Sequence, residues 1–282
     1  MKYKILVYMA ITLFPIYATA QQQESMAIDQ KRLQFSLGVQ KLSLIDASKS
    51  PLIYTARAIP SVGIGYERQT SDQVYGAGLQ LSYGGFGAKN LPPRNVIISS
   101  EDLYGKVSRN PIPAQGNILN GEINLYYLKR ISKAYSKYTL YLGGRLSDEI
   151  YYPSGSINAG NPVNFASLAA QAKVIGRMNN RNEVGLQAHL PLLSLVTRDP
   201  FDGTFSEPGK SLQHSFFSKG SKFRSLDTYQ SIQLGIWYQY LASNRWGFKA
   251  SGIAGWKKLN EPAKFRSVNS QAVLQINYNL SK

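Results

Sequence analysis

Apolar and polar residues alternate with a period of two through most of the chain. In the last segment, asparagine and glutamine fill odd positions, and the even ones hold Val268, Ala272, Leu274, Ile276, Tyr278 and Leu280. Successive side chains of a β-strand point to opposite faces, so this segment has one apolar and one polar face. The rhythm recurs in segments 33–44, 58–68, 73–84, 118–132, 137–147, 161–177, 183–195, 229–241, 245–257 and 267–280. The pattern therefore predicts an all-β chain.

The connections between these segments alternate in length. Residues 69–72, 133–136, 178–182 and 242–244 form short connections, and residues 46–57, 85–117, 148–160, 196–228 and 258–266 form long ones. Most segments reach the roughly 9 to 11 residues that a tilted strand needs to cross a bilayer. Short turns on one side and long loops on the other are typical of outer-membrane barrels.

The chain is thus predicted to form a single antiparallel transmembrane β-barrel of about ten strands, because lipid offers no partner to a free sheet edge. The short turns would be periplasmic and the long loops extracellular. A further hairpin over Asn95–Val107 would raise the strand count to twelve.

Residues 1–20 have the pattern of a secretory signal peptide. Lys2 and Lys4 precede the apolar run Ile5–Ile16, and Ala18-Thr19-Ala20 supplies a site of small residues for cleavage. Cleavage after Ala20 would leave residues 21–32 as a periplasmic N-terminal segment and residues 33–282 as one barrel domain, with long loops near 85–117 and 196–228. We therefore expect the protein in the cell outer membrane.

Aromatic residues also occupy apolar-face positions near the short turns, where a membrane protein has a belt of aromatic side chains at the interface between lipid and water. These residues are Tyr66, Tyr75, Tyr127, Tyr138, Tyr238, Tyr240, Trp246 and Tyr278. Arg68 and Lys129 share this parity at the same edge, where they can reach lipid headgroups. A soluble sandwich gives no reason for this alignment.

The opposite parity is polar and predicts a charge network in the lumen, made of Glu67, Glu122, Arg130, Arg145, Lys173, Arg177, Glu183 and Lys249. Folding the strands about their short turns places Arg177 opposite Glu183, and Glu122 level with or diagonal to Arg145. Opposed unlike charges stabilise neighbouring strands. Two interpretations stay open: an interior plug of ion pairs, because a ten-stranded barrel is narrow, or a basic-lined passage for small anions.

The loop 196–228 offers the other candidate site. It contains Phe201, Phe205, Phe216, Phe217 and Phe223, which predict either a lid packed on the barrel or a surface that docks a protein partner. His214 in the same loop supports an alternative function, a surface hydrolase (lipase or protease). His189, the other histidine, has lumen parity and is interpreted as a polar filler.

The composition narrows the possible chemistry. The chain has no cysteine, so it has no disulfide and no thiolate metal site, and no metal or cofactor motif is present. The net charge of +16 is spread over an exported chain. Lipopolysaccharide phosphates are thus a better anionic partner than nucleic acid.

The strand pattern and the Tyr-rich strands resemble Gram-negative outer-membrane β-barrel proteins, and the Gln-rich start after Ala20 is similar to uncharacterised small barrels of Bacteroidota. The omptin proteases share the strand count but none of their motif is found here. The polar, charge-paired inner face and the two large loops favour a non-enzymatic barrel, either a narrow pore or a structural or accessory component of an outer-membrane complex. Its partners would be outer-membrane lipid, lipopolysaccharide and another surface protein held by the long loops.

Overall fold

The computed structural model of the protein describes residues 29–91, 95–101, 104–113, 115–132, 138–155, 162–199, 207–261 and 263–281. The barrel strands among these residues are β1 (Gln30–Asp46), β2 (Ser50–Gln69), β3 (Gln73–Ala88), β6 (Gln115–Arg130), β7 (Tyr138–Ser154), β8 (Val163–Arg177), β9 (Asn182–Thr197), β11 (Tyr229–Leu241), β12 (Trp246–Leu259) and β13 (Phe265–Asn279). In the part of the chain described, no helix is long and apolar enough to span a membrane.

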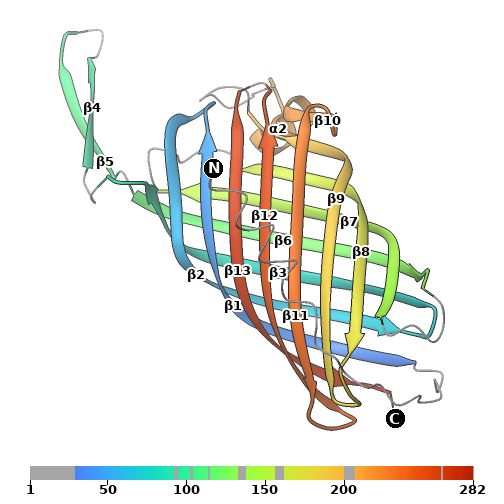
Figure 1. The fold of residues 1–282 in the computed structure, drawn as a ribbon. Helices are drawn as coiled ribbons and strands as arrows, with labels where there is room; N and C mark the ends of the chain where they lie inside the picture. Colours follow the sequence, from blue (N-terminus) through green and yellow to red (C-terminus); the bar gives the residue numbers. More distant parts are fainter. Residues whose placement is uncertain are drawn as a thin grey trace, which may run out of the picture.

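These ten strands form a closed antiparallel barrel (Figure 1). Each strand pairs with its neighbour in the chain, apart from insertions, and β1 pairs with β13 to bring the first and last strands together. The pairing of β8 with β9 closes the sheet. The predicted barrel of ten strands is confirmed.

The hairpin expected near Asn95–Val107 exists but does not enter the barrel. β4 (Asn95–Glu101) and β5 (Val107–Pro113) pair only with each other, in a separate two-stranded sheet that projects from one end of the barrel (Figure 1). Pro111 and Pro113 lie on β5 and lack the amide hydrogen that a central strand donates. The twelve-strand alternative is therefore wrong.

The strands are longer than the sequence pattern predicts. β1 starts at Gln30, before the expected barrel start at Leu33, and β2 is 20 residues long. The predicted long loop 46–57 is consequently only a turn between Asp46 and Ser50, followed by strand. Register shifts between Gln40 and Leu42 and between Leu44 and Asp46 mark bulges in this hairpin. A bulge interrupts the strict alternation on which the prediction depends.

The outer face of the barrel is apolar and exposed. Phe35, Leu37 and Val39 of β1 are 51%, 67% and 53% exposed, and each other strand adds similar residues. The predicted aromatic residues lie on this face near the short turns, where the Trp246 and Tyr278 rings pack with centroids 4.8 Å apart. This arrangement is typical of a surface that contacts lipid.

The end of the barrel opposite the short turns carries the other insertions. Between β9 and β11 lie the helix α2 (Leu212–Gly220) and the short strand β10 (Ser221–Ser225), which extends the sheet along β9. Ser211 caps α2, because its hydroxyl oxygen accepts a hydrogen bond from the amide of His214.

Candidate functional site

All eight charges predicted for the lumen lie at inward-facing strand positions, and the structure groups them into layers. Arg177 lies opposite Glu183 in the register, and its Nε donates to Glu183 Oε1 at 2.9 Å. Arg145 forms an ion pair with Glu122, although the register places Arg145 opposite Tyr126 and Glu122 opposite Glu149, so the two charges are neither level nor diagonal. Arg130 lies at the end of β6, where it donates to the carbonyl of Ser71 in a short turn.

The layer nearest the short turns is built around Glu67. This carboxylate accepts hydrogen bonds from Lys173 Nζ at 2.8 Å and from the Tyr126 hydroxyl at 2.7 Å. Arg32 Nη1 is 3.7 Å from its other oxygen. We call Arg32, Glu67, Tyr126 and Lys173 the Glu67 cluster. Arg32 was not predicted as a lumen residue, because residues 21–32 were assigned to a segment outside the barrel.

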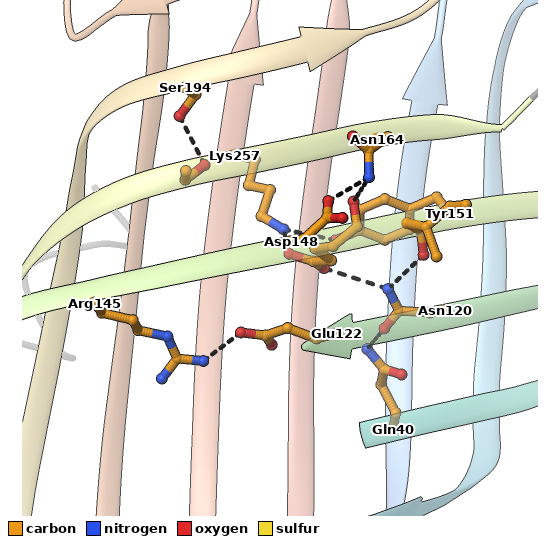
Figure 2. Close-up of polar contacts among 12 residues, drawn as sticks. Gln40, Asn120, Glu122, Arg145, Asp148, Tyr151, Asn164, Ser194 and Lys257 are labelled. Atoms are coloured by element: carbon orange, nitrogen blue, oxygen red, sulfur yellow. Dashed lines mark hydrogen bonds and ion pairs between the residues drawn. The ribbon is translucent and has the colours of Figure 1, made fainter. Parts of the chain in front are cut away.

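The middle layer is a chain of amide and carboxylate contacts (Figure 2). Gln40 donates to Asn120 at 3.0 Å, and Asn120 in turn donates to Glu149 at 3.3 Å. Lys257 forms an ion pair with Glu149 and donates to the Tyr151 hydroxyl at 3.0 Å. His189 has lumen parity, as expected, and faces Gln171 and Gln233 in the register.

Sequence reasoning missed part of this layer for a simple reason. Glu149 and Tyr151 fell in the predicted loop 148–160, whereas β7 continues to Ser154. Lys257 shares the parity of Lys249 on the same strand, so continuing the alternation along β12 would have found it.

Apolar side chains fill the lumen beyond the polar layers, at the end that carries α2. We call this group the apolar plug. Its members are all buried and come from every one of the ten barrel strands: Leu42, Leu44, Tyr54, Ala56, Ile59, Phe86, Ala88, Ile118, Tyr151, Val163, Phe165, Val196, Tyr229, Leu259 and Phe265. The rings of Phe165 and Phe265 pack with centroids 5.2 Å apart at its centre. On most strands these residues continue the parity that carries polar residues nearer the short turns. On β2 and β9 a bulge shifts Tyr54, Ala56 and Val196 to the other parity.

A buried ion pair closes the same end. Arg198, directly after β9, contacts Asp46 at the end of β1, and their side chains are only 1% and 2% exposed. Arg198 also donates to the carbonyl of Ala263 in the β12–β13 connection and lies over the Phe265 ring, 5.6 Å from its centroid. One side chain thus ties together three connections at the extracellular rim.

The predicted phenylalanine surface divides into two kinds of residue. Phe216 on α2 is buried, whereas Phe217 and Phe223 are 52% and 73% exposed. Phe201 and Phe205 lie outside the described residues, as do the predicted signal peptide 1–20 and its cleavage site. The structure therefore brings Phe216 against the barrel end and leaves Phe217 and Phe223 facing solvent.

His214 is exposed on the first turn of α2. The hydroxyls near it are engaged elsewhere: Ser218 donates to Glu207 at 3.2 Å, and Ser215 Oγ accepts from the Glu207 amide. Within the described segments, no contact joins the His214 ring to a hydroxyl or a carboxylate, and no group of three or more potential metal ligands occurs. This geometry lacks the linked nucleophile, base and orienting group of a hydrolase.

Comparison with solved structures identifies the architecture. Over 92% of this chain and 99% of the other, the structure is similar to the outer-membrane protease OmpT from Escherichia coli, with a TM-score of 0.52 and 12% identity. The fold is that of an outer-membrane β-barrel. At this identity the likeness concerns the fold alone.

Two further matches are more distant. The translocator domain of the autotransporter NalP from Neisseria meningitidis has a TM-score of 0.35 and 10% identity, covering 98% of this chain and 94% of that one. The attachment invasion locus protein Ail of Yersinia pestis has a TM-score of 0.30 and 10% identity, covering 88% and 99%. Neither the protein-family models nor the curated proteins contain a match.

Proposed function

We propose that this protein is a non-enzymatic outer-membrane β-barrel with a closed lumen, which serves as a structural or accessory component of an outer-membrane complex. The observation that carries the proposal is the apolar plug, to which all ten strands contribute. An ion that crosses this layer must give up its hydration without gaining a partner, which is strongly unfavourable. The plug therefore favours a scaffold over the narrow pore that the polar inner face alone allows.

The exposed apolar band supports a location in the outer membrane, with lipid and lipopolysaccharide around the strands. A cleaved signal peptide ending at Ala20 would deliver the chain there. An origin in Bacteroidota remains part of the proposal, on the strength of the Gln-rich start and the Tyr-rich strands.

With a closed lumen, the segments available to bind a partner are those at the extracellular end of the barrel. The projecting hairpin exposes Ile97 (61%) and Tyr104 (95%), and the α2–β10 segment exposes Phe217 and Phe223. Large apolar side chains in solvent mark protein interaction sites when they cluster. We propose that Phe217 and Phe223 dock a protein partner at the cell surface.

Single-channel recording on the refolded protein tests the closed lumen. We expect no current steps across a planar bilayer from protein whose closed barrel is verified by a heat-shifted gel band. Discrete steps with an anion-biased reversal potential would instead establish a pore.

Co-purification from membranes tests the docking role. Replacing Phe217 and Phe223 by Ser should remove a bound partner, whereas the control variant Tyr104→Ser on the hairpin should retain it. An unchanged set of co-purified proteins in the Phe217→Ser, Phe223→Ser variant would reject docking through these side chains.

A surface hydrolase with His214 in its site is the alternative function. If this alternative held, His214→Ala would abolish hydrolysis of lipid or peptide substrates. We expect no hydrolysis that depends on His214, because its ring has no catalytic partner among the described residues.

A further inference from the structure

A cavity of about 120 Å³ lies inside the barrel on the short-turn side of the apolar plug. Polar side chains in its wall come from Ser36, Gln80, Gln187, Ser251 and Gln275. Trp237 and Lys249 also line the cavity. One water needs roughly 10 to 15 Å³ of such space. The cavity therefore has room for a small ion together with a few waters.

Lys249 is the charged group in this wall. Within the described part of the chain it forms no ion pair, and its nearest aromatic contact is the Trp237 ring, with Nζ 5.0 Å from the centroid. The neighbouring carboxylate, Glu67, is already engaged by Lys173, Arg32 and Tyr126.

The local charge balance is thus positive. Arg32, Lys173 and Lys249 face the single carboxylate of Glu67, and the next ion pair, Arg177 with Glu183, is balanced in itself. Lys249 is half-buried and shares the Glu67 carboxylate with two other cations. An excess of positive charge that is partly withdrawn from water is unfavourable, and proteins usually compensate it.

The uncharged groups around Lys249 also favour a negatively charged ligand. The indole N–H of Trp237 is buried and has no hydrogen-bond acceptor among the described residues. The glutamine and serine side chains in the wall can all donate a hydrogen bond as well as accept one. This environment suits a group that carries negative charge and accepts hydrogen bonds.

We propose that the cavity beside Lys249 is a binding site for one small inorganic anion of the size of a halide or phosphate. The anion would neutralise Lys249 and accept hydrogen bonds from the wall. The site is independent of the proposed scaffold role, because a closed barrel can hold an ion that it does not transport.

Iodide is a suitable probe, since it is a small anion and quenches tryptophan fluorescence on contact. The variant Trp246→Phe, Trp256→Phe leaves Trp237 as the single tryptophan of the chain. Iodide is titrated into this refolded protein at constant ionic strength, with bulky gluconate as the balancing anion. We expect quenching that saturates, and no saturable quenching by the cation caesium.

Variants of Lys249 decide the outcome. Lys249→Met should weaken iodide binding by about tenfold or more, the equivalent of losing a charge-assisted hydrogen bond. Lys249→Arg should restore it, and Lys41→Met on the outer face is the matched control that should change nothing. Saturable quenching that persists in Lys249→Met, or linear quenching in every variant, would overturn the proposal.

Competition and stability supply independent readouts. Chloride and inorganic phosphate are each tested for displacement of iodide, which separates the two natural sources of anion. In the native sequence, the competing anion should raise the temperature of the heat-shifted transition, and this rise should disappear in Lys249→Met. A temperature that responds equally in both proteins would contradict the site.

Discussion

At the scale of single residues, Gly185 makes room for the Trp237 ring in the barrel interior. These residues face each other across the β9–β11 ladder, and a Cβ on Gly185 would lie 2.2 Å from the indole ring. We predict that Gly185→Ala destabilises the barrel by about 1–3 kcal/mol, the usual cost of overpacking a filled interior. Urea unfolding of the refolded protein in micelles measures the change.

Gly85 on β3 is the matched control, because nothing lies within 4 Å of a Cβ built there. Gly85→Ala should leave the unfolding midpoint unchanged or raise it slightly, since alanine restricts the unfolded chain. Equal losses in both variants would mean that the packing of the indole on Gly185 is not the cause.

The pair of Arg198 and Asp46 is the second residue-scale test. Arg198→Met leaves the buried Asp46 carboxylate without its partner, and we expect a loss of about 3–5 kcal/mol in the free energy of unfolding. Adding Asp46→Leu should recover most of that loss, because the pair is then replaced by apolar groups. Urea unfolding of both single variants and the double variant yields the coupling energy; additive losses would show that the two side chains do not act together.

At the scale of elements, α2 is held by a carboxylate that precedes it. Glu207 accepts a hydrogen bond from Ser218 at 3.2 Å and forms an ion pair with Lys210 at 2.8 Å, and this hydrogen-bonded pair lowers the pKa of Glu207 below its ordinary value. A lowered carboxylate pKa contributes stability above the unfolded pKa, and the contribution disappears as the pH falls through the folded pKa. We therefore predict that α2 loosens selectively in acid.

Hydrogen exchange of the α2 amides, corrected for intrinsic pH dependence, checks this prediction. Exchange should accelerate as the pH falls below the ordinary glutamate range, and Glu207→Gln should exchange fast at every pH. Asp227→Asn, which removes a carboxylate bonded to Ser225 outside the helix, is the control and should leave α2 unaffected. A pH response that survives Glu207→Gln would assign the loosening to another group.

The elements also show what sequence reasoning can recover. Strict alternation found the ten barrel strands and placed all eight predicted lumen charges at inward positions, because parity depends only on local geometry. Strand ends were harder, since the bulge near Leu42 shifts the parity and β1 and β2 continue well past it. Glu149 was missed because β7 continues past the predicted strand end at residue 147. The contact of Arg198 with Asp46 joins residues 152 positions apart, and no local pattern reveals it.

At the scale of the whole molecule, the inner face changes from polar to apolar along the barrel axis. Polar layers occupy the half near the short turns, and the apolar plug occupies the other half. Period-two analysis assigns Leu42 to a face but not to a height, and Phe265 fell in the predicted loop 258–266, so neither was recognised as part of a plug. The plug means that this barrel has the interior of a globular protein at its extracellular end.

Opening the plug is the decisive test of this view. Phe165→Ala combined with Phe265→Ala removes two rings that pack against each other in the plug, where each truncation typically costs about 3–5 kcal/mol. We expect this variant to give current steps in a planar bilayer where the native sequence gives none. Phe35→Ala with Phe248→Ala deletes the same number of rings from the outer face and should stay silent. If the plug variant also stays silent while its gel band still shifts on heating, the seal lies in the ion-paired layers around Glu67 and Glu149, and the plug contributes stability alone.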